Sequence, residues 1–358
     1  MWLPSRSECA PVGGRGPHPG YASEGAGIKG FTRICGAGGR PRPKPQHRVG
    51  CALPGFGKDN RLEQNATLRG VALMVVAMGV LPLLDVCAKF LGQGGIPILQ
   101  IVWARMFFGA AFTLPFAWQV AGARALWPDR PGFHTARAAF LVGSTACFFG
   151  AISFMPIADS LAIFFVQPLL ITALSPLLLK EKVGPRRWAA VAIGFCGTLI
   201  IIRPGLQDFN PGMALAFASG TCMALYMLIT RRLARDEDPL MTTFHTSLMG
   251  AAMMSLALPF LWEAPDAGEW GLLLLLAAIA VAGHFLIARA YTMAEASLLA
   301  PLAYTEMIMA TLAGWWFFGE MPDRWTFVGV AILIACAVYI SVRERVRRVA
   351  VAREFEQP

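Results

Sequence analysis

Charged residues are scarce in this chain. Only 15% of its 358 residues are Asp, Glu, Lys or Arg, whereas soluble globular proteins carry about 25%. Hydrophobic residues make up 56% of the chain, and the mean hydropathy is +0.54. This composition argues against an ordinary cytosolic enzyme.

Motifs for catalysis, metal binding and ATP hydrolysis are also missing. The sequence contains no GxSxG, no HExxH and no Walker motif, so neither a hydrolase nor an ATP-driven pump is indicated. The eight cysteines show no CxxC spacing and no His partner at metal-ligand spacing. We therefore expect no metal site and no cofactor, and we interpret the cysteines from Cys87 onward as small buried hydrophobic residues.

The net charge of +9 would fit a nucleic-acid partner, but its distribution does not. Residues 1–66 hold ten basic and four acidic residues, and residues 343–358 hold five basic and three acidic residues. The two tails thus account for eight of the nine net charges, and the sequence between them is nearly neutral. This pattern predicts a core embedded in a lipid bilayer, basic tails and no nucleic-acid partner.

The tail of residues 1–66 is rich in Gly, Pro and Arg. It has no apolar run long enough for a secretory signal, and it has too few hydrophobic residues to offset chain entropy, so we predict that it is disordered. Two interpretations stay open: a lipid-binding arm, or a start codon that lies downstream, near Leu62 or Leu68. A downstream start would need a non-AUG codon, because no Met occurs between Met1 and Met74.

Apolar stretches of about 20 residues, each long enough to cross a bilayer as a helix, recur from Arg69 onward. Helices are expected because lipid offers no partner for backbone polar groups. The sequence predicts an all-α integral membrane protein with ten spans, at residues 68–91, 97–120, 133–155, 157–179, 186–203, 211–231, 240–262, 270–290, 295–318 and 325–342.

The basic residues between these spans predict the orientation. With both termini in the cytoplasm, sixteen Lys and Arg residues, Arg137 among them, fall on the cytoplasmic side. Only Lys89, Arg203 and Arg324 fall on the other side. Because cytoplasmic loops carry the excess of Lys and Arg, we predict a multi-pass inner-membrane protein with both termini, including the basic tail 343–358, in the cytoplasm.

The two halves of the chain align with each other. A shift of 142 places Gly70 on Gly212 and Lys89 on Arg231, a shift of 137 places Ala151 on Ala288, and a shift of 139 places Glu181 on Glu320. The pattern predicts two five-helix repeats, residues 67–203 and 204–342. Because five is odd, the second copy would be inverted relative to the first, as in many secondary transporters.

These features resemble the EamA-type drug/metabolite transporter superfamily. The resemblance rests on the ten-span plan, on Ser160-Leu-Ala followed by Lys180-Glu181, and on Ser297-Leu-Leu-Ala-Pro-Leu followed by Gly319-Glu320. Short segments are similar to a bacterial branch that includes S-adenosylmethionine uptake carriers: Trp103-Ala-Arg105, Asp208-Phe-Asn-Pro211, Tyr304-Thr-Glu306 and Glu320-Met-Pro-Asp323. The resemblance implies the fold and a transport role.

Polar side chains inside the spans are the candidate site, because charge at membrane depth is costly and usually faces a cavity or the bundle interior. Arg105 would bind a substrate carboxylate or phosphate or pair with a protein carboxylate; a structural ion pair or a snorkelling side chain is the alternative. Glu306 would act as a proton-coupled switch or an amine ligand, or as a neutral group bonded to a neighbouring helix. Trp103 and Tyr304 would add aromatic contacts.

Other polar residues in the spans have weaker signals. Asp85 and Lys89 are spaced to pair on one helix face; Lys89 would snorkel to the interface, while Asp85 lies deeper. Gln167-Pro168 would kink the fourth span and expose an amide, as Pro301 would kink the ninth. We interpret His245 and His284 as packing residues rather than proton relays.

Small-residue rows, Ala190/Gly194/Thr198 and Ala331/Ala335, favour the fifth and tenth spans as scaffold or as the surface of a homodimer.

The leading hypothesis is a secondary carrier, not an enzyme. It would move a small polar or zwitterionic metabolite across the bacterial inner membrane by alternating access, with proton coupling suggested by the buried carboxylates. Two alternatives were weighed. An integral-membrane enzyme acting on lipid would need paired catalytic residues that His245 and His284 lack. A non-transporting sensor or scaffold would tolerate neutralisation of Arg105.

Overall fold

The computed structural model describes residues 59–128, 130–179, 183–203, 210–233, 238–294 and 296–339, all within one unit, Gly55–Pro358. The predicted disordered tail therefore falls outside the described residues up to position 58, as do the C-terminal tail and Glu181. The first helix begins at Asp59, earlier than the predicted span, which starts at residue 68.

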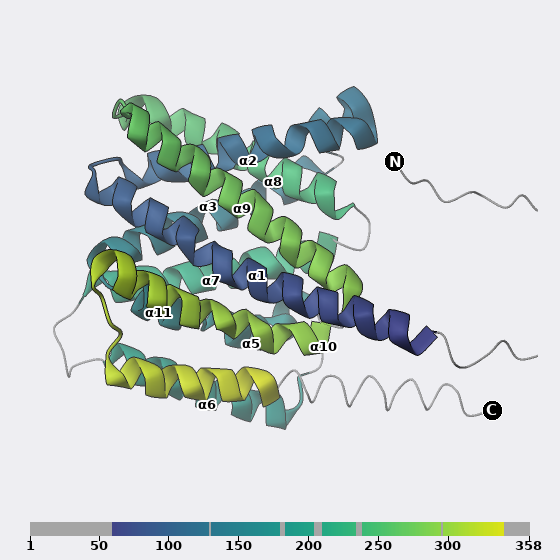
Figure 1. Ribbon diagram of the computed structural model, residues 1–358, viewed down its shortest axis with the longest axis vertical. Helices are drawn as coiled ribbons and strands as arrows, with labels where there is room; N and C mark the ends of the chain where they lie inside the picture. Colours follow the sequence, from purple (N-terminus) through teal and green to yellow (C-terminus); the bar gives the residue numbers. More distant parts are fainter. Residues whose placement is uncertain are drawn as a thin grey trace, which may run out of the picture. The chain divides into compact units, whose positions relative to one another are not determined.

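The described part of the chain is helical throughout and contains no strand, as predicted. Figure 1 shows the helices running side by side. In chain order they are α1 (Asp59–Gln93), α2 (Ile98–Ala121), η1 (Gly122–Leu126), α3 (Pro131–Phe154), α4 (Ile157–Phe164), α5 (Gln167–Leu179), α6 (Pro185–Ile202), α7 (Pro211–Leu233), α8 (Pro239–Ala257), η2 (Leu258–Phe260), α9 (Ala267–Met293), α10 (Ala296–Leu299), η3 (Ala300–Tyr304) and α11 (Thr305–Phe318). A last helix follows at Arg324–Tyr339.

Seven helical segments among the described residues are long and apolar enough to cross a membrane. They correspond to the first six predicted spans and the eighth. The other three predicted spans coincide with α8, with the interrupted stretch α10–η3–α11 and with the last helix, which is short. Ten crossings therefore remain a prediction.

The fourth and ninth predicted spans are both broken. The helix stops at Phe165–Val166, between α4 and α5, and it tightens into η3 before α11. The breaks fall at the predicted kinks, next to Pro168 and at Pro301. They also face each other, because the rings of Phe165 and Tyr304 lie 5.0 Å apart.

The helices pack across the two predicted repeats rather than within them. The largest contacts are those of α1 with α9 and of α3 with α7, followed by α2 with α8. If α7, α8 and α9 of the second repeat correspond to α1, α2 and α3 of the first, exchanging the repeats converts the first contact into the second and leaves the third unchanged. The packing therefore has the internal two-fold relationship that the duplicated sequence predicts.

Two aligned glycines make close contacts between the repeats. A Cβ on Gly70 of α1 would lie 3.2 Å from the Ala290 carbonyl oxygen of α9, and a Cβ on Gly212 of α7 would lie 3.1 Å from that of Ala151 in α3. The contacts match the predicted pairing of Gly70 with Gly212. They pair Ala151 with Ala290, however, two residues away from the predicted partner Ala288.

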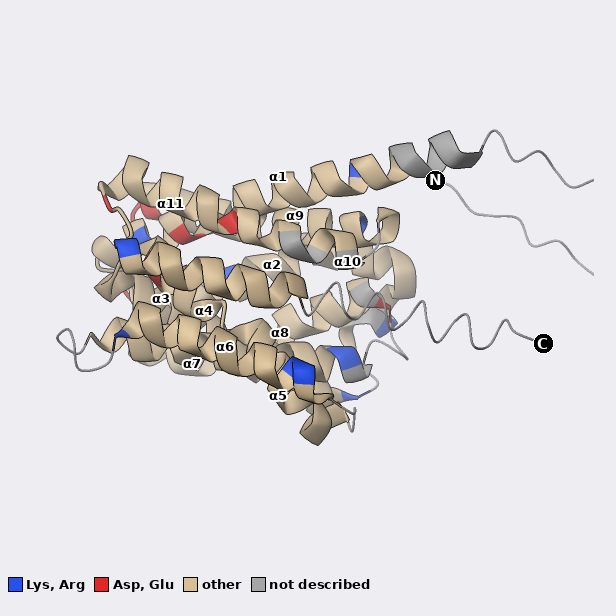
Figure 2. Cartoon of the chain, turned by 90° about the horizontal axis from the view of Figure 1, so that it is seen from below, with Lys and Arg blue, Asp and Glu red and all other residues tan. Residues whose placement is uncertain are grey.

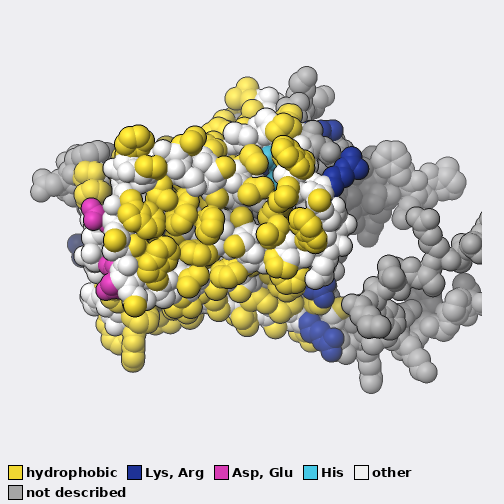
Figure 3. Space-filling view, turned by 90° about the horizontal axis from the view of Figure 1, so that it is seen from above, with side chains coloured by type: hydrophobic (Ala, Val, Ile, Leu, Met, Phe, Trp, Pro, Cys, Tyr) yellow, Lys and Arg dark blue, Asp and Glu magenta, His cyan; other side chains and the backbone are white. Residues whose placement is uncertain are grey.

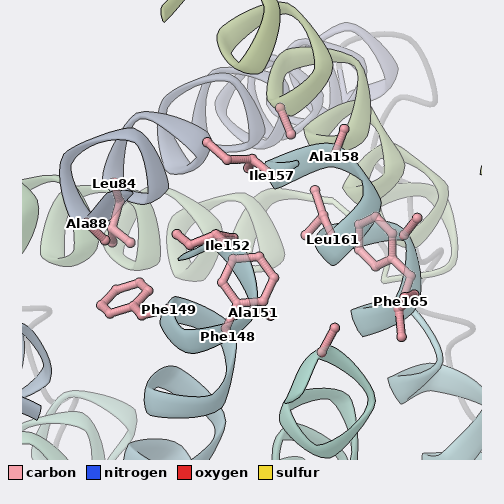
Figure 4. Packing of buried hydrophobic residues seen from close by; sticks show 14 of the residues in the cluster. Leu84, Ala88, Phe148, Phe149, Ala151, Ile152, Ile157, Ala158, Leu161 and Phe165 are labelled. Carbon is pink, nitrogen blue, oxygen red and sulfur yellow. The ribbon is translucent and has the colours of Figure 1, made fainter. Parts of the chain in front are cut away.

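Apolar side chains form the core and also cover much of the outer surface. The core centres on the meeting of α1, α3 and α4, where Leu84, Phe149 and Leu161 are buried together (Figure 4). On the surface, large side chains such as Leu256 and Phe260 are fully exposed. Figure 3 shows yellow side chains over this face with charged residues at its two ends, which is the pattern of a protein that spans a bilayer.

The small-residue rows have two different environments. Ala190, Gly194 and Thr198 are buried, and Gly194 lies against Leu169 of α5. Ala331 and Ala335 of the last helix are exposed. The first row therefore packs inside the bundle, and the second remains a predicted surface for scaffold contacts or a homodimer.

Candidate functional site

Arg105 lies at the centre of the polar interior. It is half-buried on α2, and its Nη1 donates a hydrogen bond to Thr145 Oγ1 on α3. It also interacts electrostatically with Asp85 on α1, Tyr226 on α7 and His284 on α9. Side chains from five helices of both repeats thus converge on one guanidinium group.

Asp85 supplies negative charge next to Arg105, and Glu306 lies near Asp85. Asp85 is buried on α1 and interacts electrostatically with both Arg105 and Glu306. Glu306 is half-buried in the first turn of α11, directly after η3. Within the described part of the chain, neither carboxylate has a hydrogen-bond or ion-pair partner. A buried charge without a partner is costly in apolar surroundings, so these two groups are available for a ligand or a proton.

Gln167 starts the second half of the broken fourth span as Glu306 does in the ninth. A shift of 139, which aligns Glu181 with Glu320, also places Gln167 on Glu306. The Oε1 atom of Gln167 is buried and has no partner among the described residues. Electrostatic interactions link Asp85 to Arg105 and to Glu306, whereas no interaction in the described chain joins Gln167 to any of the three, so its place in the site stays a prediction.

Trp103 and Tyr304 lie apart from this group. Two residues along a helix correspond to about 200° of rotation, so each aromatic ring points away from its charged neighbour, Arg105 or Glu306. Trp103 donates a hydrogen bond to Ser255 Oγ at 2.9 Å and stacks on Phe107. Tyr304 packs on Phe165. The contacts of Trp103 and Tyr304 with a substrate therefore stay a prediction.

Tyr226 is a polar residue of this region that the sequence does not indicate, and Arg137 holds it. Arg137 is 3% exposed on α3. It donates to Tyr226 Oη at 2.9 Å, to Thr230 Oγ1 at 2.8 Å and to the Thr242 carbonyl oxygen at 2.7 Å. Each of its three guanidinium nitrogens thus has an acceptor, which explains how an arginine near a span boundary can be buried. It holds Tyr226 in place beside Arg105.

Ion pairs between the repeats cluster at one end of the bundle, where α1, α3 and α11 finish; we name it the ion-paired end (Figure 2). Lys89 Nζ lies 2.6 Å from Glu320 Oε1 and donates to the Met155 carbonyl oxygen at 3.3 Å. Further links join Arg203 to Asp323 and Asp159 to Thr326. Each pair takes one residue from each repeat.

This arrangement overturns two interpretations of Lys89. It is 5% exposed and does not snorkel to the interface, and its carboxylate partner is Glu320 rather than Asp85. The lysine reaches Glu320 because the helix α11 ends at Gly319 with a left-handed conformation, φ 67°, which turns the chain back toward α1.

No group of three or more His, Cys, Asp or Glu side chains that could hold a metal ion occurs among the residues that the structure describes. His245 is buried and packs edge-to-face on His134, with ring centroids 4.9 Å apart, which fits its interpretation as a packing residue. His284, by contrast, is exposed.

The chain matches the EamA-like transporter family twice, over residues 68–203 and 210–342. It is 26% identical over 280 residues to the S-adenosylmethionine uptake transporter of Rickettsia prowazekii, covering 78% of this chain and 94% of that protein. It is 28% identical over 278 residues to the riboflavin transporter of Vibrio cholerae, covering 76% and 93%. It is 25% identical over 281 residues to the pseudopaline exporter of Pseudomonas aeruginosa, covering 75% and 94%.

One solved crystal structure shares the fold. It superposes with a TM-score of 0.54, over 80% of this chain and 99% of the other, at 22% sequence identity. The two segments that match the EamA-like transporter family, residues 68–203 and 210–342, have nearly the same bounds as the two predicted repeats, residues 67–203 and 204–342.

Proposed function

Because the chain belongs to the EamA-like transporter family, we propose that it is a secondary carrier which moves a small zwitterionic metabolite by alternating access. The observation that carries the proposal is the position of Asp85 inside the bundle, where it interacts electrostatically with both Arg105 and Glu306. A ligand that carries both a carboxylate and a cation would satisfy both kinds of charge.

The proposed topology has ten crossings in two inverted repeats. The seven apolar helices, α8, the interrupted stretch α10–η3–α11 and the last helix account for ten segments, five in each repeat. An odd number of crossings inverts the second copy, and the excess of Lys and Arg places both termini in the cytoplasm. The ion-paired end then faces outward from the inner membrane.

S-adenosylmethionine is the substrate that the charges fit best. It carries an α-carboxylate, an α-ammonium and a sulfonium group, so its charged groups can engage one guanidinium and two carboxylates. An arginine binds a carboxylate through two parallel hydrogen bonds, which assigns this group to Arg105. Asp85 and Glu306 would then interact with the positively charged groups of S-adenosylmethionine. Several relatives are named for uptake of this compound.

The two ends of the bundle differ in a way that suits alternating access. At the ion-paired end, Lys89 and Glu320 tie the repeats together. At the opposite end, Phe112 and Phe116 of α2 are exposed. In the proposed cycle the pair between Lys89 and Glu320 closes the outer side while the central group is reached from the cytoplasm, and it opens in the other state.

Uptake of radiolabelled S-adenosylmethionine into proteoliposomes tests the proposal. The wild-type protein should exchange the compound across the bilayer, with unlabelled S-adenosylmethionine competing and riboflavin not competing. If riboflavin competes and unlabelled S-adenosylmethionine does not, riboflavin replaces S-adenosylmethionine as the proposed substrate. Liposomes with Arg105→Gln protein are the matched control, since that variant should show no exchange above empty liposomes.

A further inference from the structure

One stripe of α9 changes from buried to exposed halfway along the helix. Leu273, Ala277 and Ala280 follow helical spacing on a single face, and all three are buried, with Leu273 0% exposed. His284 and Tyr291 continue the same stripe but are exposed. Phe285, next to His284 in the sequence, is 62% exposed. His284 is therefore exposed on a face of α9 that is buried nearer the start of the helix.

The change in exposure follows the separation of α2 from α9. The rings of Phe108, in the middle of α2, and Trp270, near the start of α9, lie 6.3 Å apart. Further along α2, Phe116 is 56% exposed, and in Figure 1 the two helices diverge toward their ends. His284 lies in this second half of α9, where it is exposed and interacts electrostatically with Arg105.

The imidazole of His284 has one nitrogen committed and one available. Its Nδ1 lies 2.7 Å from the Ala280 carbonyl oxygen, and because a carbonyl oxygen only accepts hydrogen bonds, Nδ1 carries the proton. In the neutral ring the lone pair is then on Nε2, which has no partner within the described chain. The ring also lies close enough to Arg105 to interact with it electrostatically.

We infer that His284 is a specificity-determining ligand, whose Nε2 accepts a hydrogen bond from the α-ammonium group of the substrate while Arg105 binds the adjacent carboxylate. The inference rests on the proposed function and names the substrate group that His284 recognises. In an α-amino acid the two groups share one carbon atom, so their ligands must be neighbours, as His284 and Arg105 are. Asp85 and Glu306 remain for a second cation, such as a sulfonium.

Binding of S-adenosylmethionine and of its analogue without the α-amino group tests this assignment. The wild-type protein should prefer S-adenosylmethionine by about 10- to 100-fold in Kd, the value of a hydrogen bond to a charged group. In His284→Phe the two compounds should bind within about twofold of each other. His284→Gln, whose amide oxygen can still accept, should restore part of the preference, and Phe285→Leu at the next position should leave it unchanged.

The outcomes separate the two claims. An unchanged preference in His284→Phe, with S-adenosylmethionine still bound, would overturn the role of His284 alone. If the wild-type protein binds neither compound, S-adenosylmethionine is not the substrate, and the role inferred for His284 is wrong as well.

A labelling experiment on the wild-type protein avoids any folding effect of a variant. Diethyl pyrocarbonate acylates accessible imidazole nitrogens, so it should modify His284 and spare the buried His134 and His245. Saturating S-adenosylmethionine should slow the modification of His284 at least tenfold, as measured by mass spectrometry. The same labelling rate with and without S-adenosylmethionine, under conditions where binding is measured, would contradict the assignment.

Discussion

Lys89 Nζ lies 2.6 Å from Glu320 Oε1, although 231 residues separate the two side chains along the sequence. The lysine belongs to the first repeat and the glutamate to the second. The ammonium group also donates to the Met155 carbonyl oxygen and lies 5.1 Å from the centre of the Phe318 ring. One cation therefore joins α1 to the end of α3 and to the turn after α11, and it holds the two repeats together at the ion-paired end.

Removing one member of this pair should destabilise the protein more than removing both. Lys89→Gln leaves the half-buried Glu320 carboxylate without its partner, so we expect the free energy of unfolding to fall by about 1–3 kcal/mol. The double variant Lys89→Gln/Glu320→Gln removes both charges and should recover most of this loss. Thermal unfolding of the purified proteins in detergent gives the comparison.

Arg289→Gln, at an exposed arginine of α9, is the control and should change the melting temperature little. If the double variant is no more stable than Lys89→Gln alone, the two charges are not coupled, and this ion pair does not hold the repeats together at the ion-paired end.

Arg105 should be required for the substrate carboxylate and not for the rest of the substrate. Arg105→Gln is expected to weaken S-adenosylmethionine binding about 10- to 100-fold, because a charge-assisted hydrogen bond is lost. The decarboxylated analogue should bind Arg105→Gln and the wild-type protein with similar Kd. Ligand-induced increases in melting temperature report both affinities. Equal losses for the two compounds would mean that Arg105 supports the fold instead of binding the carboxylate.

Arg105→Lys separates charge from geometry. Lysine keeps the positive charge but cannot make two parallel bonds to a carboxylate, so its affinity should fall between those of the wild-type protein and Arg105→Gln. An affinity equal to that of the wild type would show that charge alone is sufficient.

The helices and their breaks could be predicted because they depend on local sequence. Long apolar runs fix the positions of the helices, and Pro168 and Pro301 mark the two interruptions, since proline cannot donate within a helix. The repeat could also be found from sequence, because Gly70 and Gly212 occupy equivalent close contacts. The earlier start of α1 at Asp59 shows the usual limit, as composition alone locates helix ends poorly.

The partners of the charged residues could not be predicted, because they depend on which helices pack together. Asp85 is one helical turn from Lys89, yet the lysine bonds Glu320 across the repeats. Arg137 lies near a span boundary, and α7 and α8 supply its acceptors. His284 lies in an apolar run like His245, yet His245 is buried and His284 is exposed.

The close contact of α1 with α9 should not tolerate one added methyl group. In Gly70→Ala the new Cβ would lie 2.9 Å from Ala294 Cβ, which requires the helices to move apart and should cost about 1–3 kcal/mol of unfolding free energy. Gly271→Ala, also in a helix interior but with open space around it, should instead stabilise by about 0.5–1 kcal/mol. Parallel thermal unfolding of the two variants checks the sign difference; equal effects would contradict the packing of Gly70.

Glu306 should couple transport to a proton gradient. Its carboxylate lies near Asp85 without a partner in the described chain, so a proton can neutralise it when the site is empty, and a substrate cation can replace that proton. Glu306→Gln keeps the shape and cannot release a proton. In proteoliposomes with an imposed pH gradient, the wild-type protein should accumulate labelled S-adenosylmethionine several-fold above the level without a gradient, whereas Glu306→Gln should show the same level in both conditions.

Exchange of labelled for unlabelled substrate across the bilayer is the control for this variant. Exchange needs binding and the change of access but no net proton movement, so Glu306→Gln should still perform it at a measurable rate. Loss of exchange together with accumulation would assign Glu306 to substrate binding rather than to coupling. An undiminished response to the gradient would remove Glu306 from the proton pathway and leave Asp85, the other unpartnered carboxylate beside Arg105, as the group to test by Asp85→Asn.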